Sequence, residues 1–363
     1  MGCCDMTRER IVATLRDAGC TEETIAQYLA ACDAGDEKKA RQLIEAHRKT
    51  LLEQFHKSCS CIDCLDYFVE KTTRGKGEHM KENRQQIYTA ERAQFFANGQ
   101  RYTDCIFEDG ESPLKHASSI ELQGSMFRWK YPLWYTSNVT ARDCTWFDMA
   151  RAGVWYTKNI ALERALIEAP KNFRRCEGLR LDDVSFSDAA ETLWNCRDVR
   201  LSNVTACRAD YFAMNCENMT VDHLTLYGNY TFDGAKNVTI RNSKLLSKDA
   251  FWNSENITVY DSFISGEYLG WNSKNLTLIN CTVESLQGMC YIENLVMKNC
   301  RLINTTLAFE YSTVKAQIDS RIDSVLNPAG GTIRAQSIGE LILEKDRIDP
   351  EKTVILCKGE PQA

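Results

Sequence analysis

The chain has 363 residues, an apolar content of 44% and a formal net charge of −6, with a sequence pI near 5.6. This length and apolar content predict a soluble, globular protein with room for two domains. The acidic balance and the lack of a basic stripe argue against nucleic acid as a partner. No run of about 18 consecutive apolar residues and no apolar amino-terminal segment is present, so we expect no membrane partner and a cytoplasmic location.

Residues 1–72 carry apolar side chains at helical spacing, which predicts an α-helical domain. Thr21 can cap a helix whose first turn contains Glu22 and Glu23. Residues 36–70 predict one long helix with a seam at alternating steps of three and four residues. The seam consists of Ile44, Arg48, Leu51, Phe55, Ser58, Ile62, Leu65 and Val69. Such a seam predicts a coiled coil and therefore a homodimer, and an intramolecular helical hairpin is the alternative.

The stretch from Gly19 to Lys71 resembles the dimerising helical segment of mercury-resistance-type regulators, without the winged helix that binds DNA in them. The resemblance therefore implies pairing of two chains. The same stretch contains the close cysteines Cys59, Cys61 and Cys64. Because only His56 could serve as a fourth ligand nearby, we interpret these thiols as packing residues and predict no metal and no cofactor.

Residues 73–86 are rich in charge and glycine and predict a linker. Residues 87–345 contain a repeat in which an Asn-like residue is followed by apolar, polar and apolar positions. Nine copies of this repeat begin at residues 138, 159, 178, 198, 218, 237, 256, 275 and 294, and residues 346–363 predict a tail. A short strand repeated about every 19 residues must be covered by its neighbours, so we predict a single-stranded right-handed parallel β-helix.

The chain contains many N-x-S/T sequons, and most of them arise because the Asn-like position precedes a strand that carries Thr, so they do not indicate glycosylation. Asn tolerates left-handed backbone, and stacked Asn amides can bond to one another along a ladder. Another repeat position carries Cys144, Cys281 and Cys300 where other rungs have Val or Ser. We therefore expect buried, reduced thiols and no disulfide.

A second strand precedes each Asn-like position and is unusually aromatic. Its tryptophans, four residues before the Asn-like position, are Trp134, Trp155, Trp194, Trp252 and Trp271. Either this column fills the core, or it faces outward and offers a platform for sugar rings, and both alternatives remain open from the sequence.

Ionisable residues gather beside the tryptophan column, and the predicted binding residues among them are Glu191, Asp210 and Lys248. The carboxylates considered for catalysis are Asp233, Asp249 and Glu267. Carboxylates one or two rungs apart would lie about 5 to 10 Å from each other, which brackets the separations found in glycosidases. Arg174 and Arg175 would instead suit a lyase base, and ordinary ion pairs are the simplest alternative.

Several motifs closely resemble a bacterial family known as domain of unknown function 3737, DUF3737. They are GESPLKH from Gly110, WKYPLWY from Trp129, APKNFRR from Ala169, SKDAFWN from Ser247, GEYLGWNSKNLTLINC from Gly266 and FEYS from Phe309. The resemblance spans residues 87–343 and implies a β-helix related in shape to pectate-lyase-like proteins, with no assigned activity.

We therefore predict a β-helix with a carbohydrate-binding or carbohydrate-processing surface, whose ligand is an oligosaccharide or another small molecule. The alternative is a non-enzymatic interaction scaffold that dimerises through its amino-terminal helices.

Overall fold

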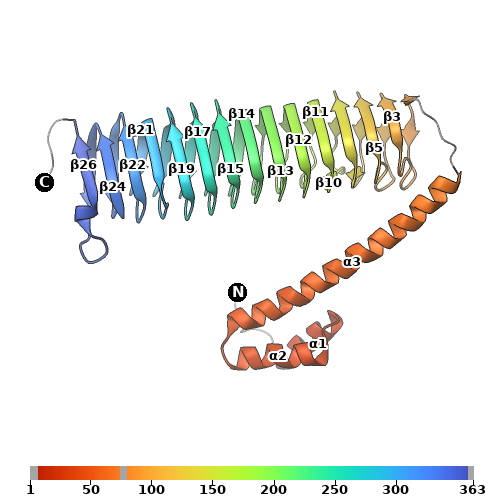
Figure 1. Ribbon diagram of the computed structural model, residues 1–363, viewed down its shortest axis with the longest axis horizontal. Coiled ribbons are helices and arrows are strands. Elements are labelled where there is room, and N and C mark those ends of the chain that lie inside the picture. Colours follow the sequence, from red (N-terminus) through yellow and green to blue (C-terminus); the bar gives the residue numbers. More distant parts are fainter. Residues whose placement is uncertain (1–6, 74–79, 359–363) are drawn as a thin grey trace. The chain divides into compact units, whose positions relative to one another are not determined.

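The computed structural model describes residues 7–73 and 80–358. The chain divides into two compact units, Met1–Gly77 and Glu78–Ala363, of which the first is helical and the second is a solenoid of strands (Figure 1). No helix among the described residues has the length and apolar character needed to cross a membrane.

The helical unit contains α1 (Arg8–Asp17), α2 (Glu22–Asp33) and α3 (Glu37–Thr73). The Thr7 and Thr21 hydroxyls accept hydrogen bonds from backbone N–H groups in the first turns of α1 and α2. These caps satisfy donors that a helix start leaves unpaired, as the sequence predicts for Thr21. The single long helix predicted over residues 36–70 is confirmed, and its 37 residues give a length of about 55 Å.

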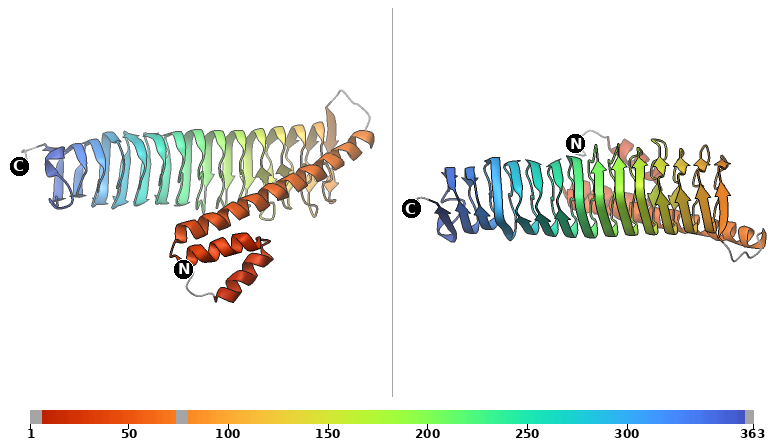
Figure 2. Two further views of the ribbon diagram at one scale, coloured as in Figure 1. Left: turned by 60° about the horizontal axis from the view of Figure 1, so that its bottom comes forward. Right: turned by 90° about the horizontal axis from the view of Figure 1, so that it is seen from above.

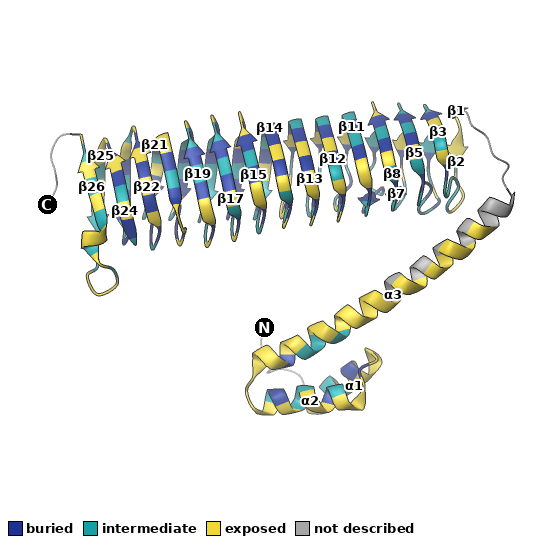
Figure 3. Ribbon diagram, in the orientation of Figure 1, coloured by how far each residue is buried: buried dark blue, intermediate teal, exposed yellow. Residues whose placement is uncertain are grey.

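The helical unit has a small core. Leu15, Cys20 and Ile25 are buried, and Ile44 of α3 packs against them. Further along α3 the described apolar side chains are not packed in this core. Ile62 is 51% and Leu65 is 67% exposed, and Figure 3 colours this part of α3 mainly as exposed.

The solenoid consists of parallel strands, and 22 of them join in one sheet (Figures 1 and 2). The strands are β1 (Lys81–Arg84), β2 (Ile87–Tyr88), β3 (Asn98–Thr103), β4 (Ile106–Phe107), β5 (Ser118–Gln123), β6 (Met126–Phe127), β7 (Leu133–Trp134), β8 (Ser137–Arg142), β9 (Thr145–Trp146), β10 (Val154–Trp155), β11 (Lys158–Ile167), β12 (Glu177–Phe186), β13 (Arg197–Ala206), β14 (Glu217–Asn229), β15 (Lys236–Arg241), β16 (Lys244–Lys248), β17 (Glu255–Tyr260), β18 (Phe263–Glu267), β19 (Lys274–Ile279), β20 (Thr282–Leu286), β21 (Leu295–Thr306), β22 (Thr313–Ile318), β23 (Arg321–Leu326), β24 (Gly330–Ala335), β25 (Ser337–Ile342) and β26 (Thr353–Cys357). The predicted right-handed parallel β-helix is confirmed.

Successive rungs are in register. Val238 of β15 pairs with Ile257 of β17, which pairs with Leu276 of β19, so equivalent residues lie 19 positions apart. All three side chains are buried, and the intervening residues face outward (Figure 3). Each rung therefore covers the apolar face of the next one, as the sequence period predicts.

The Asn-like position forms the predicted ladder. Asn256 has a φ of 58°, and its amide donates to Asn237 at 3.0 Å. The Asn275 amide donates to Asn256 at 2.8 Å, and the Asn294 amide donates to Asn275 at 2.8 Å. The side chain that permits the left-handed turn therefore also links adjacent rungs.

The strands extend beyond the predicted boundaries at both ends. Strand β1 lies inside the predicted linker 73–86, and β26 lies inside the predicted tail 346–363. Strand β1 pairs with β3 through its backbone although its side chains are mostly exposed, so it lacks the apolar alternation that marks inner rungs. Strand β26 lacks the preceding Asn that marks the repeat, although it pairs with β24.

The described cysteines are free thiols. Cys144, Cys281 and Cys300 are buried as predicted, and burial raises the pKa of the Cys144 thiol to about 12. In the amino-terminal cluster Cys61 and Cys64 are exposed, whereas the side chains of His56 and Cys59 lie outside the described residues. Among the side chains that the structure describes, no three His, Cys, Asp or Glu residues are placed to hold a metal.

Candidate functional site

The tryptophan column faces outward. Trp134, Trp155, Trp194, Trp252 and Trp271 are half-buried, whereas the residue before each of them points into the core and is buried. For example, Phe251 is fully buried and stacks on Phe232 in the interior, with ring centroids 5.5 Å apart. The alternative in which the tryptophans fill the core is therefore wrong.

The indole faces are covered by neighbouring rungs. Trp134 and Trp155 are stacked at 5.0 Å with an angle of 6° between their planes. The Arg174 guanidinium lies between Trp155 and Trp194, 4.7 and 4.4 Å from their ring centroids. Side chains of one outward column repeat at the rung spacing of about 4.8 Å, so flat rings stack on each other and leave mainly their edges to solvent.

The stack is interrupted between Trp194 and Trp252. Backbone hydrogen bonds that join successive rungs place Met214 and Asp233 in the tryptophan column at this point. Two tyrosines of a neighbouring column, Tyr211 and Tyr230, are stacked here at 5.1 Å. The interruption brings a carboxylate into an aromatic surface.

Asp249 lies in the same column as Tyr230, one rung further on. It is only 8% exposed, and the Tyr230 side chain lies close enough to influence its pKa. Burial raises the pKa of Asp249, and the neighbouring Glu267 adds to the rise, whereas Tyr230 and Lys248 oppose it. The charge of Asp249 is also the main reason that the pKa of Tyr230 is raised. Asp249 therefore gives up its proton less readily than an exposed aspartate, which is the direction of shift that a general acid needs.

The other two carboxylates considered for catalysis have ordinary partners. Asp233 accepts a hydrogen bond of 2.9 Å from the Asn253 amide. Glu267 forms an ion pair of 3.0 Å with Lys248. Both carboxylates also influence the neighbouring pair of Tyr230 and Asp249. Asp233 contributes to the raised pKa of Tyr230, and Glu267 contributes to the raised pKa of Asp249.

We call this region the aromatic–acidic surface. It consists of Tyr211, Tyr230, Asp233, Lys248, Asp249, Trp252, Glu267, Tyr268 and Trp271. Trp252 stacks on Trp271 at 5.9 Å, and the Trp252 indole N–H donates to the Tyr268 carbonyl at 2.9 Å. The region therefore combines fixed ring edges with carboxylates and one ammonium group.

The remaining predicted residues lie on other rungs or have structural partners. Glu191 is paired with Lys171 and Arg174, each at 3.1 Å. Asp210 accepts a hydrogen bond of 2.9 Å from the Asn229 backbone. Trp134 and Trp155 belong to rungs well before the aromatic–acidic surface. Arg174, the lyase alternative, is held between two indoles and by Glu191.

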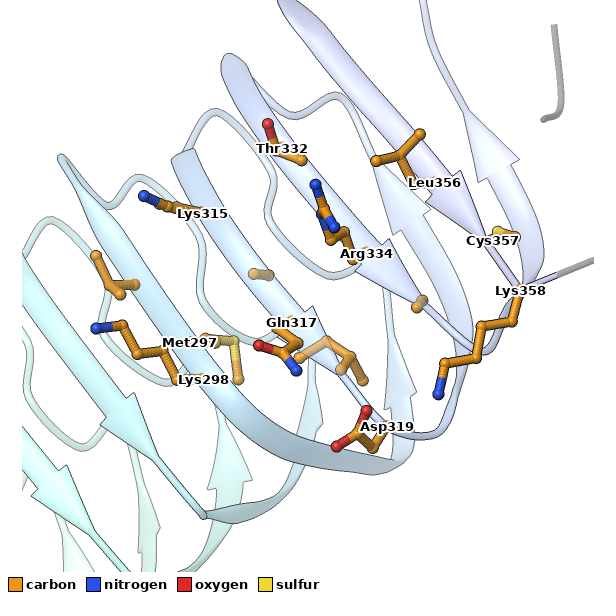
Figure 4. A pocket seen from close by; sticks show the side chains of 14 residues that line it. Met297, Lys298, Lys315, Gln317, Asp319, Thr332, Arg334, Leu356, Cys357 and Lys358 are labelled. Atoms are coloured by element: carbon orange, nitrogen blue, oxygen red, sulfur yellow. The ribbon is translucent and has the colours of Figure 1, made fainter.

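The sequence reasoning missed a groove of about 600 Å³ on the outward face of the last rungs (Figure 4). Lys298, Lys315, Arg334 and Lys358 line it. Cations at neighbouring rungs could have indicated it, but the strands after residue 313 lack the Asn marker, and Lys358 lies in the predicted tail.

The comparisons concern the solenoid. A family model described as "Protein of unknown function (DUF3737)" matches residues 81–356. No curated protein matches the chain. Among solved structures, the surface adhesin PfbA of Streptococcus pneumoniae is 8% identical, with 72% of this chain and 81% of that chain covered and a TM-score of 0.35.

Two further solved structures are similar at the same level. The tailspike protein of E. coli bacteriophage HK620, solved with a pentasaccharide, is 9% identical over 77% of this chain and 74% of that chain, with a TM-score of 0.37. The A-module of the mannuronan C-5 epimerase AlgE4 of Azotobacter vinelandii is 10% identical over 78% and 88%, with a TM-score of 0.25. At these identities the likeness concerns the winding of the solenoid alone.

Proposed function

The chain belongs to the DUF3737 family, whose description assigns no function, and from its own side chains we propose that the solenoid binds a carbohydrate at the aromatic–acidic surface. The observation that carries this proposal is the buried Asp249 side chain beside Tyr230, at the interruption of an outward aromatic column. A carboxyl that is buried at a cost in free energy is unusual on the outside of a solenoid, and its presence favours a binding role.

Sugars present hydroxyl groups and C–H faces within one small ring. The carboxylates of Asp233 and Glu267 can bond sugar hydroxyls, since each keeps bonding capacity beyond its protein partner. The Asn253 amide, which donates to Asp233 and accepts from Asn272, keeps one further N–H for the same purpose. The ring edges of Trp252 and Tyr268, both of which contact Trp271, supply apolar contact beside these groups. A small number of polar groups held among aromatic rings is typical of sites that bind small ligands.

The surface also has one group suited to chemistry. With its pKa raised by burial, Asp249 keeps its proton to a higher pH than an exposed aspartate does. A protonated carboxyl beside a glycosidic oxygen is the acid that glycoside cleavage needs. Release of shorter sugars by the purified protein would extend the proposal from binding to processing.

Glycan-array screening followed by calorimetry tests the proposal. We expect Trp252→Ala to weaken the bound carbohydrate about tenfold, because an anchor beside Asp249 is lost. Trp134→Ala is the matched control, since Trp134 is stacked in the same way on a distant rung. Failure of every carbohydrate to bind, or an equal loss in both variants, would overturn the proposal.

A second role is supported by the helical unit. Ile62 and Leu65, both predicted seam residues, are more than half exposed on α3. Apolar side chains repeated along one helix face in this way favour pairing with the same face of a second copy. We propose that the protein is a homodimer through α3, which would present two solenoids together.

A further inference from the structure

In the first half of the tryptophan column, a cation of the chain itself lies between two indoles. The Arg174 guanidinium is 4.7 Å from the ring centroid of Trp155 and 4.4 Å from that of Trp194. The charge of this guanidinium is balanced by Glu191, whose carboxylate lies 3.1 Å from it. Rings, cation and carboxylate thus satisfy one another within the chain.

Where the column is interrupted, rings and carboxylates lie together without such a cation. Backbone hydrogen bonds that join successive rungs place Asp233 next to Trp252 in the column. In the described part of the chain, no Lys or Arg nitrogen lies within 4.0 Å of a carboxylate oxygen of Asp233 or Asp249. The cation–ring contacts of the same part involve other rings than those of Tyr230 and Trp252. The interruption therefore lacks the positive charge that Arg174 supplies on an earlier rung.

Burial separates Asp249 from ordinary carboxylates without an ion pair. Asp198, for example, is exposed to solvent, and water stabilises its charge. Asp249 and Glu310 are each 8% exposed and are the least exposed carboxylates in the described part of the chain. Glu310 accepts a hydrogen bond of 2.9 Å from the Gln287 amide, whereas burial raises the pKa of Asp249. A missing positive charge is therefore costly at Asp249.

The acidic groups converge on one place. Asp249 is the main reason that the pKa of Tyr230 is raised, and Asp233 adds to the rise, so both lie near the Tyr230 hydroxyl. Glu267 in turn contributes to the raised pKa of Asp249. The ammonium of Lys248 lies nearby, and it is bound to Glu267 at 3.0 Å. Three carboxylates against one ammonium make this place attractive to a further cation.

We propose that the carbohydrate of the aromatic–acidic surface is an amino sugar whose free ammonium group lies between the carboxylates of Asp233 and Asp249. This inference rests on the proposed function and names the class of its ligand. The ammonium supplies the charge that Arg174 supplies between its two indoles. An ammonium has three N–H donors, so it can bond two carboxylates and a hydroxyl at once.

An amino sugar fits this surface because its ammonium is attached directly to the ring. The C–H groups beside the amine can therefore contact an aromatic edge while the amine meets a carboxylate. Trp252 offers such an edge next to Asp233 in the column, and it stacks on Trp271 at 5.9 Å. A lysine side chain or a polyamine has its ammonium on a flexible stem, so it loses more conformational entropy for the same bonds.

Calorimetry with the full chain and matched probes tests the inference. The probes are β-1,4-linked tetramers of glucosamine, N-acetylglucosamine and glucose, which differ only in an ammonium, an acetamide or a hydroxyl on each ring. Spermine is the fourth probe, because it carries as many ammonium groups as the glucosamine tetramer without a sugar ring.

We expect the glucosamine tetramer to bind about tenfold more tightly than each of the other three probes, since it combines a charge-assisted bond with ring contacts. The measurement uses mildly acidic buffer, in which the sugar amine is protonated and exposed carboxylates are ionised. The affinity should fall as sodium chloride is raised.

Asp233→Asn removes one negative charge and keeps a side chain of the same size. The preference for the glucosamine tetramer over the N-acetylglucosamine tetramer should fall about tenfold in this variant. Asp198→Asn is the matched control, because Asp198 accepts from the Asn218 amide at 3.0 Å much as Asp233 accepts from Asn253 at 2.9 Å, but in a different column. The control should leave the preference unchanged.

The outcomes distinguish this inference from the proposed function. If the N-acetylglucosamine or glucose tetramer binds equally or more tightly and loses affinity in Trp252→Ala, the inference is wrong and the proposed function stands. An unchanged preference in Asp233→Asn, an equal loss in Asp198→Asn, or equal binding of spermine would also overturn the inference. Failure of every carbohydrate to bind would overturn both.

Discussion

The helical unit and the solenoid bury their apolar side chains in different ways. In the solenoid each rung is covered by the rungs before and after it, so residues such as Ile257 and Leu276 are inaccessible. In the helical unit Ile44 of α3 packs against the small core formed with α1 and α2, whereas Leu65 is 67% exposed. Repetition thus completes a core within one chain, whereas an isolated long helix depends on a partner.

The same contrast applies to polar groups. The ion pairs of the solenoid mostly join neighbouring rungs, as Lys236 and Glu255 do at 3.3 Å. Ion pairs of α3 join residues of one helix, such as Arg41 and Glu45 at 2.8 Å. A solenoid therefore links sequence-distant residues through each column, and a change in one rung affects its two neighbours.

The largest effect should come from the solenoid core. Phe251→Ala removes a fully buried ring that stacks on Phe232, and we expect a loss of about 3 to 5 kcal/mol in the free energy of unfolding. Leu65→Ala, measured by urea denaturation at nanomolar protein, should change that free energy by less than about 0.5 kcal/mol. Equal losses in the two variants would contradict the comparison.

The oligomeric state, unlike the free energy of unfolding, should depend on the exposed seam of α3. Ile62→Lys combined with Leu65→Lys places two charges in the seam, and we expect light scattering at micromolar concentration to change from dimer to monomer. Cys64→Lys is the control, since Cys64 is exposed in the same turn but lies off the seam. A monomeric unmodified protein would refute the dimer proposal.

The turns of the solenoid should contribute less than its core. Asn256→Ala removes a side chain that bonds both neighbouring rungs and puts Ala at a φ of 58°, so we expect about 2 to 3 kcal/mol of destabilisation. Asn256→Gly keeps the left-handed backbone available, and it should cost only about 1 kcal/mol. If thermal and urea denaturation rank the two variants equally, backbone strain does not contribute at this position.

Two aspartates of the solenoid should respond to pH with opposite sign, and this is the smallest expected effect. Arg164 and Gln123 hold the pKa of Asp143 at about 2, below the unfolded value near 3.9, so its contribution exists above pH 3.9 and is lost as pH falls toward 2. Burial raises the pKa of Asp249, so its contribution is complete below pH 3.9 and is lost as pH rises through the folded pKa.

Urea denaturation over a pH series measures both contributions. The stability advantage of the unmodified protein over Asp143→Asn should disappear at the acidic end. Relative to Asp249→Asn, the unmodified protein should instead lose stability as pH rises. Parallel curves for the two variants would show that Asp249 is not held in a buried site.

Much of the fold could be predicted from the sequence because its signals are local and repeated. A strand with apolar residues at every second position, preceded by Asn and repeated every 19 to 21 residues, requires stacking in register. The seam from Ile44 to Val69 likewise predicts the helix that became α3. The end strands β1 and β26 were missed because end rungs need less apolar alternation.

The residues that lie together in the candidate site could not be predicted from the sequence, because tertiary structure decides them. Trp134 and Tyr135 are adjacent aromatic residues, and both lie on the outside because the left-handed backbone at Tyr135, with a φ of 55°, breaks the period-2 alternation of a strand. The stacking of Trp155, Arg174 and Trp194, the burial of Asp249 against Tyr230 and the joining of Lys298, Lys315 and Arg334 in one groove all link residues of different rungs. The sequence alone determined the rung and its period, whereas the surroundings of each outward side chain were decided by register, bulges and neighbouring columns, because those contacts join residues about 19 positions apart.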